Sequence, residues 1–194
     1  VYKRQILDCW FLTGATASGK TSTSIQLAKA LDAEIISLDS MSIYKEMDIG
    51  TAKPTQADQA AVPHHLLDLI PPTDTFSVSQ YCDLAHQQID KLRAKGKAVL
   101  FVGGTPLYLK SLLRGIFEGP PADWEFRREI EHEIEAHGLD ALRERLKLVD
   151  PLSAHKLHAN DQRRMIRALE VYRATGKPIS HLQTHFDQSR SKEN

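Results

Sequence analysis

The stretch "FLTGATASGKT", residues 11–21, decides the fold of the first part of the chain. From Gly14 to Thr21 it contains the complete pattern G-x-x-x-x-G-K-T, after a short apolar run and before residues with helical periodicity. Glycines permit the tight backbone that aims N–H groups at a phosphate, and the following helix adds the positive end of its dipole. This context favours a phosphate-binding loop over an ordinary Gly/Ser turn. The pattern leaves the chemistry open, because kinases, ATPases and other transferases share it.

Two further apolar runs have the composition of buried strands. "AEIISLDS" ends on Asp39 and the residue after it, and "KAVLFVGG" ends on Gly103 and its neighbour. Residues 75–96, between these runs, have a helical pattern closed by a glycine. Strands that alternate with helices predict an α/β fold of the P-loop NTPase type, with a parallel sheet covered on both faces. Ligands bind at the carboxyl ends of such strands, so we expect Gly14, Asp39 and Gly103 to share one cleft.

The composition of the chain changes at Pro120. Residues 125–147 are rich in charge and helical in pattern, with Gly138 as a break, and no further apolar strand run follows. We therefore predict two domains. Residues 1–119 would form a P-loop α/β core without its last elements, and residues 120–194 would form a helical insertion domain.

The charge of the whole chain is balanced, with 25 basic and 25 acidic residues, so a surface for nucleic acid would have to be local. The helix expected between the cap Asp161 and the terminating Gly176 provides such a surface. Between Arg163 and Lys177, five basic residues and one acidic residue give a net charge of +4. The same run also suits an ordinary solvated helix face, and charge alone does not choose between the two.

The two cysteines lie far apart, without C-x-x-C spacing, which indicates free thiols in a reducing compartment. No apolar run approaches the roughly 18 residues of a membrane span, and the start of the chain lacks a signal-peptide pattern. We therefore expect a cytoplasmic, monomeric protein that does not bind a membrane. Several histidines are paired, but no cysteine partners them at zinc-finger spacing, so we expect no zinc site. The pairs are His64 with His65, His155 with His158, and His181 with His185.

Asp39, which follows the strand run "IISL", has three open roles. It could hold Mg²⁺, like the acid that P-loop hydrolases place after an apolar strand; it could take a proton from an acceptor substrate; or it could cap the turn "DSMS". The loop that follows carries Asp48, Gly50, Thr51 and Lys53, and polar loops on a rigid scaffold are where binding residues are expected. We therefore favour a functional role for Asp39 over a cap.

The chain resembles the tRNA dimethylallyltransferase family in five stretches: "GATASGKT", "DSMSIYKEMDIGTAKP", "VPHHLLDLIPP", "VGGTPLYLKSLLRG" and "NDQRRMIRALEVYRATGKPIS". They occur in the family's order and together cover almost the entire chain. The resemblance implies transfer of a dimethylallyl group from dimethylallyl diphosphate to N6 of adenosine 37, in tRNAs that read codons beginning with U. It also implies Mg²⁺ as the cofactor and no hydrolysis of a nucleotide.

Carried over onto this sequence, the resemblance implies two sets of residues. Lys20 and Thr21 would contact the diphosphate, Thr21 would also hold Mg²⁺, and Asp39 would accept a proton from the N6 amine, which makes these three the catalytic residues. The whole diphosphate site would comprise Gly14, Ala15, Thr16, Ala17, Ser18, Gly19, Lys20 and Thr21. The tRNA contacts would come from Asp39, Ser40, Met41, Ser42, Thr105, Arg127, Arg163, Arg164, Met165, Ile166 and Arg167.

The sequence departs from the family pattern at Ala15, Ser42 and Pro106, where the family often has proline, glutamine and glycine. None of these departures removes a charged catalytic group, so we expect them to affect fine geometry more than activity. Family members also continue well beyond "TGKPIS". We therefore expect this chain by itself to expose a sheet edge or an apolar face and to have little activity.

Three other functions stay open on sequence grounds. Prenyl transfer to a free adenine nucleotide would use the phosphate loop and Asp39 but not the arginines of residues 127–177. A P-loop kinase of a small metabolite would hold ATP on the loop and direct Asp39 at a hydroxyl group. A nucleotide-sensing module without catalysis would not need the run "DSMSIYKEMDIGTAKP".

Overall fold

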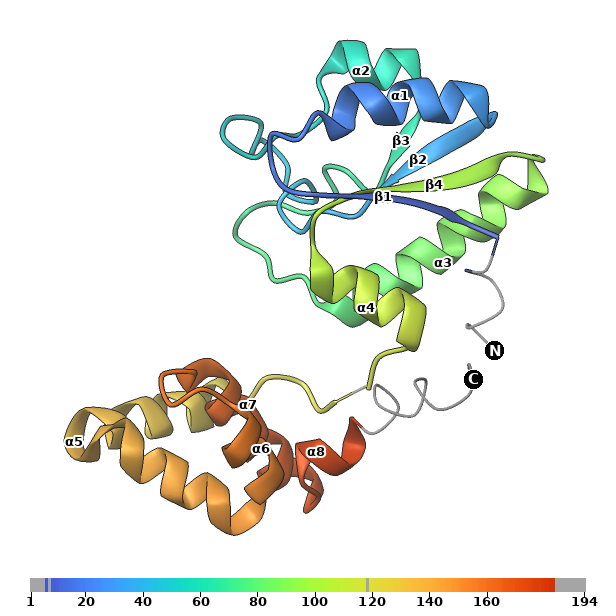
Figure 1. Ribbon diagram of the computed structural model, residues 1–194. Helices are drawn as coiled ribbons and strands as arrows, with labels where there is room; N and C mark the ends of the chain where they lie inside the picture. Colours follow the sequence, from blue (N-terminus) through green and yellow to red (C-terminus); the bar gives the residue numbers. More distant parts are fainter. Residues whose placement is uncertain (1–5, 7, 118, 184–194) are drawn as a thin grey trace. The chain divides into compact units, whose positions relative to one another are not determined.

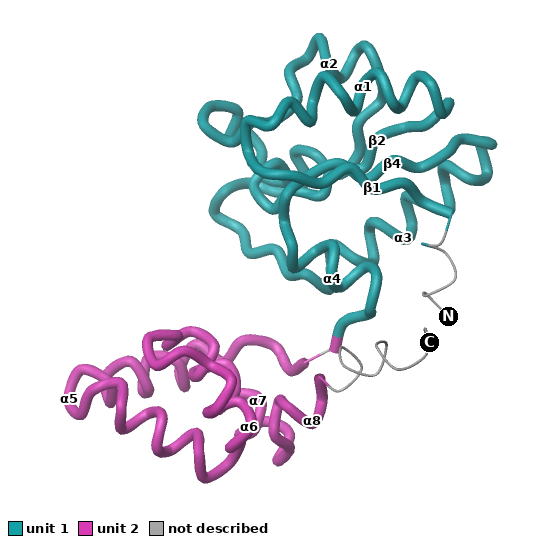
Figure 2. Tube along the Cα trace, in the orientation of Figure 1, with its two compact units in different colours: residues 1–116 teal, residues 117–194 magenta. Residues whose placement is uncertain are grey.

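The computed structural model describes residues 6, 8–117 and 119–183 of the chain (Figure 1). These residues fall into two units, unit 1 (residues 1–116) and unit 2 (residues 117–194), shown in Figure 2. The change in composition predicts a boundary between residues 119 and 120, and the division in the structure lies three residues earlier. Each unit has its own core of buried side chains.

A parallel four-stranded sheet forms the centre of unit 1. Its strands β1 (Trp10–Thr13), β2 (Ala33–Ser37), β3 (His64–His65) and β4 (Ala98–Gly103) lie in the order β1-β4-β2-β3. The predicted α/β fold with a parallel sheet is therefore confirmed. Among the described residues β1 pairs only with β4, so it forms one edge of the sheet. Trp10 on this edge strand is 55% exposed.

Helices cover both faces of this sheet (Figure 1). One face carries α1 (Lys20–Ala30) and α2 (Gln56–Ala61), and the other carries α3 (Val78–Ala94) and α4 (Pro106–Arg114). Because β2 and β4 are covered on both sides, neither alternates between apolar and polar residues: β4 is a continuous apolar run, and β2 is interrupted only by Glu34 and its terminal Ser37. The helix predicted over residues 75–96 is α3. It begins with a capping box formed by Ser77 and Gln80.

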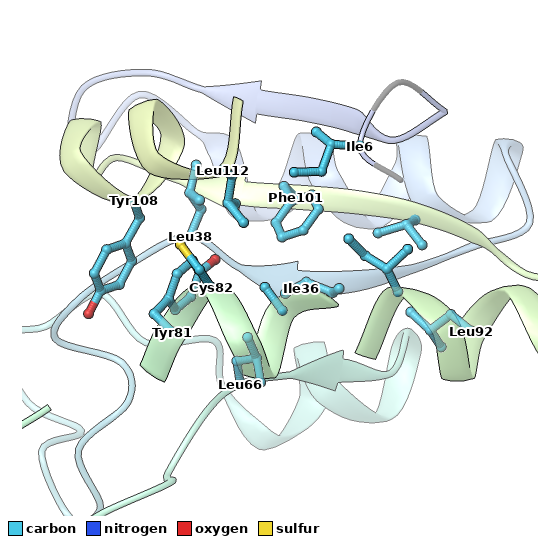
Figure 3. Close-up of a cluster of buried hydrophobic side chains, with 13 residues drawn as sticks. Ile6, Ile36, Leu38, Leu66, Tyr81, Cys82, Leu92, Phe101, Tyr108 and Leu112 are labelled. Atoms are coloured by element: carbon cyan, nitrogen blue, oxygen red, sulfur yellow. The ribbon is translucent and has the colours of Figure 1, made fainter. Parts of the chain in front are cut away.

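The larger core of unit 1 lies between the sheet and the helices α3 and α4 (Figure 3). Ile36 and Phe101 contribute from the strands, and Tyr81 and Tyr108 contribute from the two helices. The rings of Tyr81 and Tyr108 stack with their centroids 3.9 Å apart. The Tyr81 hydroxyl donates a hydrogen bond to the carbonyl oxygen of Ser37 at 2.8 Å. This bond anchors the carboxyl end of β2, where the candidate catalytic Asp39 follows.

Unit 2 contains the helices α5 (Trp124–Val149), α6 (Pro151–Lys156), α7 (Gln162–Thr175) and α8 (Ile179–Leu182). Gly138 interrupts α5 with φ 80° and ψ 168°, which is the predicted break. Asp161 caps α7 by accepting a hydrogen bond from the Arg164 N–H, and Gly176 ends it in the left-handed conformation, both as predicted. No helix within residues 6, 8–117 and 119–183 is long and apolar enough to cross a membrane.

Candidate active site

The phosphate loop connects the end of β1 to the start of α1. Gly19 caps the helix with φ 81°, a conformation that favours glycine, and Ala17 also has a positive φ of 64°. The Lys20 ammonium turns back over the loop and donates hydrogen bonds to the carbonyl oxygens of Gly14 at 2.9 Å and Ala15 at 2.5 Å. A bound phosphate would compete with these carbonyl groups for the same ammonium. The loop therefore has the backbone shape and the cation that an anion site requires.

A cavity of about 660 Å³ opens beside the phosphate loop. Lys20 and Thr21 line it on one side, Asp39 follows β2, and Gly103 ends β4. Residues 50–52 and 54 form a further wall. The expected cleft at the carboxyl ends of the strands is thereby confirmed for Asp39 and Gly103, because parallel strands end at the same edge of the sheet. Its volume lies within the usual range of ligand sites.

A second cavity of about 350 Å³ shares Gly103 and Gly104 with the first. Gly14 and Thr105 line this second cavity. The Thr105 hydroxyl accepts a hydrogen bond from the backbone N–H of Ser40 at 3.0 Å. Thr105, a predicted tRNA contact, thus also joins the loop after β4 to the loop after β2.

Asp39 both caps a turn and faces the larger cavity. Its Oδ1 atom accepts a hydrogen bond from the backbone N–H of Met41 at 2.8 Å, which is the capping role considered from the sequence. The same carboxylate lines the cavity together with Lys20 and Thr21. The cap therefore does not exclude a chemical role, because it orients the carboxylate and uses only one of its oxygen atoms.

The predicted tRNA contacts that follow Asp39 differ in their exposure. Met41 is 42% exposed, whereas Ser42 is only 2% exposed. The Ser42 hydroxyl lies 2.6 Å from the Ser37 hydroxyl and donates to the carbonyl oxygen of Asp39 at 3.1 Å. Ser42 thus holds the turn in shape, and a direct contact with tRNA stays a prediction for this residue.

Two of the predicted tRNA-contacting arginines converge on a buried carboxylate in unit 2. Arg127 binds Glu170 through two hydrogen bonds, from Nε at 2.7 Å and from Nη2 at 2.9 Å. Arg167 contacts the same carboxylate and donates to the carbonyl oxygen of Pro120 at 2.8 Å. The backbone N–H of Asp123 also donates to Glu170 at 2.8 Å. Glu170 is 2% exposed, so these donors supply the pairing that a buried charge needs.

The run "RRMIR", residues 163–167, does not present all its side chains outward. Met165 and Ile166 are 0% and 4% exposed and belong to the core of unit 2, so a tRNA contact through these side chains is not supported. The reason is helical geometry, since α7 must turn one face toward α5. Arg163 and Arg164 lie on its exposed side, and Arg167 is half-buried.

Lowering the pH should weaken the hydrogen bonds and ion pairs around Glu170. Burial acts to raise the pKa of this carboxyl, but hydrogen bonds from Arg127, Arg167 and the Asp123 N–H outweigh it and hold the pKa below the usual 4.5. A depressed pKa contributes stability that is present above the unfolded value and is lost as pH falls through the folded value. We expect Glu170→Gln to lower the free energy of unfolding of unit 2 at pH 7 by about 1–3 kcal/mol.

Urea unfolding followed by circular dichroism, at pH 7 and below pH 4.5, measures this effect. The difference between Glu170→Gln and the parent should shrink as pH falls through the lowered pKa of the folded protein, because below that pKa the parent carboxyl is itself protonated. Glu129→Gln is the matched control, because Glu129 is an exposed acid 3.3 Å from Arg173 in the same unit. If the Glu170 variant and the parent were equally stable at pH 7, the Glu170 carboxylate would not stabilise unit 2.

Two residues to which the sequence assigned no role in this site, His64 and Asp58, also line the larger cavity. Burial lowers the pKa of His64, so its ring is neutral at pH 7. The Nδ1 atom lies 2.8 Å from the carbonyl oxygen of Val62, which assigns the proton to Nδ1 and leaves Nε2 as an acceptor. The sequence placed His64 only in a histidine pair and in the stretch "VPHHLLDLIPP". Because β3 has only two residues and no readable periodicity, nothing in the pattern indicated that this side chain lines the cavity.

No group of three or more His, Cys, Asp or Glu side chains that could hold a metal occurs within the described part of the chain. Of the histidine pairs considered from the sequence, His181 with His185 extends outside that part, because His185 is not among the described residues. Among the described residues, the two cysteines Cys9 and Cys82 form no disulfide. Burial raises the pKa of Cys82 to about 11, so its thiol is protonated at neutral pH.

Comparison with known proteins assigns the chain to a family. The family of IPP transferases matches residues 42–194. The tRNA dimethylallyltransferase of Rhodopirellula baltica is 52% identical over 192 residues, which cover 95% of this chain and 58% of that protein. The corresponding enzyme of Ralstonia pickettii is 50% identical over 171 residues, 88% of this chain and 53% of that protein. The chain therefore spans little more than half the length of these relatives.

Two solved structures agree with this assignment. The tRNA isopentenylpyrophosphate transferase of Bacillus halodurans has a TM-score of 0.57 and 42% identity, over 88% of this chain and 57% of that one. A eukaryotic dimethylallyltransferase acting on tRNA has a TM-score of 0.69 and 28% identity, over 95% of this chain and 44% of that one. With most of its length matched by the family and with close relatives in it, this chain belongs to the IPP transferases.

Proposed function

We propose that the full-length protein transfers a dimethylallyl group from dimethylallyl diphosphate to N6 of adenosine 37 in tRNAs that read codons beginning with U, releasing diphosphate. One observation carries this proposal. Asp39 and the phosphate-loop residues Lys20 and Thr21 line the same cavity, so a proton acceptor and an anion site lie within one volume. Relatives named tRNA dimethylallyltransferase support the choice of reaction.

The phosphate loop would bind the leaving group of the donor. As the bond between C1 of the dimethylallyl group and the diphosphate oxygen breaks, its electron pair goes to the diphosphate. The negative charge on the departing oxygen then grows, and the loop N–H groups and Lys20 stabilise it more than they stabilise the ground state. Stabilisation that increases along the reaction raises the rate rather than only tightening binding.

The residues beside the loop suit Mg²⁺. Thr21 and Asp39 offer a hydroxyl and a carboxylate oxygen to one cavity, and Mg²⁺ prefers such hard oxygen ligands together with substrate phosphates and water. When bound, the ion would add positive charge where the diphosphate departs. Thr21 is the residue that we assign to hold it.

Asp39 would act on the acceptor. The adenine amino group is a weak nucleophile because its lone pair is delocalised into the ring, so it needs alignment and a proton acceptor. The N6 lone pair forms the new bond to C1, and the N6 proton goes to Asp39. Met41 N–H occupies Oδ1, and among the described residues no hydrogen bond uses Oδ2. The turn therefore presents one carboxylate oxygen to the incoming base.

Unit 2 would bind the anticodon arm through α7. Arg163 and Arg164 are exposed on this helix, followed by the exposed Arg173 and Lys177. Contacts to phosphate set the orientation of a bound RNA, while the target base must leave its stack to enter the cavity. A single-stranded anticodon loop lowers the cost of that step. The cytoplasmic location and monomeric state stay predictions.

The decisive experiment compares donors and acceptors. The full-length protein is incubated with Mg²⁺, unmodified tRNA and labelled dimethylallyl diphosphate, and anticodon fragments are analysed by mass spectrometry. We expect label on the adenosine next to the anticodon, none on free adenosine monophosphate and none from labelled ATP. Transfer to free nucleotide, or phosphoryl transfer from ATP, would replace the proposal by the corresponding alternative.

A further inference from the structure

Lys53 lies between two residues that line the larger cavity, Ala52 and Pro54, and its own side chain is buried. Its side chain is only 3% exposed, although lysine is rarely buried without partners. The ammonium donates to the carbonyl oxygen of Tyr44 at 2.9 Å, to Asp48 at 2.6 Å and to Asp68 at 2.7 Å. These three acceptors use all three donors of the ammonium group.

The partners of Lys53 come from separate parts of the backbone. Tyr44 and Asp48 precede it in the loop after β2, whereas Asp68 lies beyond α2 and β3. The two segments are also joined by backbone hydrogen bonds, such as that from Leu69 N–H to the Ile43 carbonyl oxygen at 2.7 Å. Lys53 therefore joins the later part of the loop after β2 to the segment after β3, which backbone hydrogen bonds already hold against the start of that loop.

The backbone around this lysine is strained. Glu46, Ala52, Leu66 and Asp68 have φ values between 52° and 62°, in the left-handed region that residues other than glycine rarely adopt. Such conformations persist only where surrounding interactions over-determine them, and they gather at binding sites. The two carboxylates that Lys53 binds lie within these strained segments. The ion pairs of Lys53 are therefore well placed to hold the strained backbone in its conformation.

The wall of the cavity consists of the neighbours of Lys53 and not of Lys53 itself. Gly50, Thr51, Ala52 and Pro54 line the same cavity as the phosphate-loop residues, while the Lys53 ammonium donates to its own acceptors. We propose that Lys53 is a positioning residue that holds the loop of residues 46–54, and with it the part of the donor-binding cavity wall formed by residues 50–52 and 54. The part that concerns the donor rests on the proposed function.

Chemistry at Lys53 itself is excluded by its surroundings. Burial acts to lower the pKa of the lysine, but hydrogen bonds to Asp48 and Asp68 outweigh it and raise the pKa above 10.5. A protonated amine with three acceptors has no lone pair to offer as a nucleophile or a base. The effect of Lys53 on catalysis must therefore pass through the loop that it holds.

Two measurements on the full-length protein test this proposal. The first is cleavage by thermolysin before Ile49, which is 97% exposed at the outer part of the loop and is cut only when the backbone can adapt to the protease. We expect Lys53→Met to raise the initial rate of this cleavage about tenfold or more, because release of the loop increases its open population. The matched control Lys45→Met, at an exposed lysine of the same loop, should cleave like the parent.

The second measurement is the kinetics of prenyl transfer. We expect Lys53→Met to raise KM for dimethylallyl diphosphate about tenfold while kcat changes by less than about threefold, since the wall contributes to binding in ground and transition states alike. Asp68→Asn removes one acceptor without leaving two unpaired carboxylates, so it should shift both readouts in the same direction but less. It keeps the proposal testable if the lysine variant does not fold.

The two readouts separate failure of the positioning role from failure of the proposed function. Cleavage before Ile49 does not depend on activity, so it tests the role of Lys53 even if the parent transfers no prenyl group. Unchanged cleavage in both the Lys53 and Asp68 variants would overturn the proposal. Faster cleavage spread over all of unit 1 would also overturn it, because Lys53 would then stabilise the fold in general. Faster loop cleavage with unchanged donor KM would overturn the part that concerns the donor.

Discussion

Replacing Asp39 by asparagine in the full-length protein is expected to lower the rate of prenyl transfer about a hundredfold or more, the usual effect of losing a positioned base. Asparagine keeps the oxygen that accepts the Met41 N–H bond, so the turn after β2 should keep its shape. The amide cannot take the N6 proton. The loss should therefore lie in the chemical step and not in the structure of the site.

Single-turnover assays with saturating tRNA and donor measure this loss directly. KM for dimethylallyl diphosphate should stay within about twofold of the parent, because the diphosphate is bound mainly by the phosphate loop. Asp74→Asn, at an exposed aspartate outside both cavities, is the control and should leave the rate unchanged. A rate within about twofold of the parent for Asp39→Asn would show that this carboxylate is not the proton acceptor.

The second large effect concerns the backbone contact on which the site is built. A Cβ atom at Gly103 would lie 2.2 Å from the carbonyl oxygen and 2.9 Å from the Cα atom of Leu38. These are backbone atoms, and Leu38 N–H donates to the Val102 carbonyl oxygen at 2.7 Å, so the two segments cannot separate without breaking their pairing. We expect Gly103→Ala to destabilise unit 1 by about 3 kcal/mol or more, at the upper end of overpacking effects.

Soluble yield and urea unfolding followed by circular dichroism measure this destabilisation. Gly104→Ala is the neighbouring control, because a Cβ atom there would approach only the Gly14 carbonyl oxygen, at 3.2 Å. We expect it to cost less than about 1 kcal/mol and to fold normally. If the two variants were equally stable, close approach of the strands at Gly103 would not be a requirement of the fold.

Much of the fold could be predicted from local pattern. Apolar runs that end at Asp39 and Gly103 are buried strands, and Asp161 caps a helix where expected. The order of the strands was not predictable, because β4 lies between β1 and β2 although it follows both in sequence. Strand order depends on which apolar faces pack together, and local periodicity does not contain that information.

The candidate site could be predicted only in part. The pattern from Gly14 to Thr21 indicated phosphate binding, and the rule for parallel sheets brought Asp39 to the same cleft. The run that ends in Arg167 suggested five RNA contacts in a row, yet Met165 and Ile166 are core residues. A resemblance in sequence assigns the same role to every residue of a segment. In a helix, however, some of those residues face the core and only the others face the solvent.

By itself, then, the sequence determined the phosphate loop, the parallel α/β class and the aspartate after β2, because each depends on a few adjacent residues or on one strand's burial. Only the tertiary structure decided that Glu170 holds Arg127 and Arg167, and that Lys53 holds Asp48 and Asp68. These are contacts between charged groups that lie up to 43 residues apart. Opposite charges occur throughout the sequence, and only folding selects which of them pair.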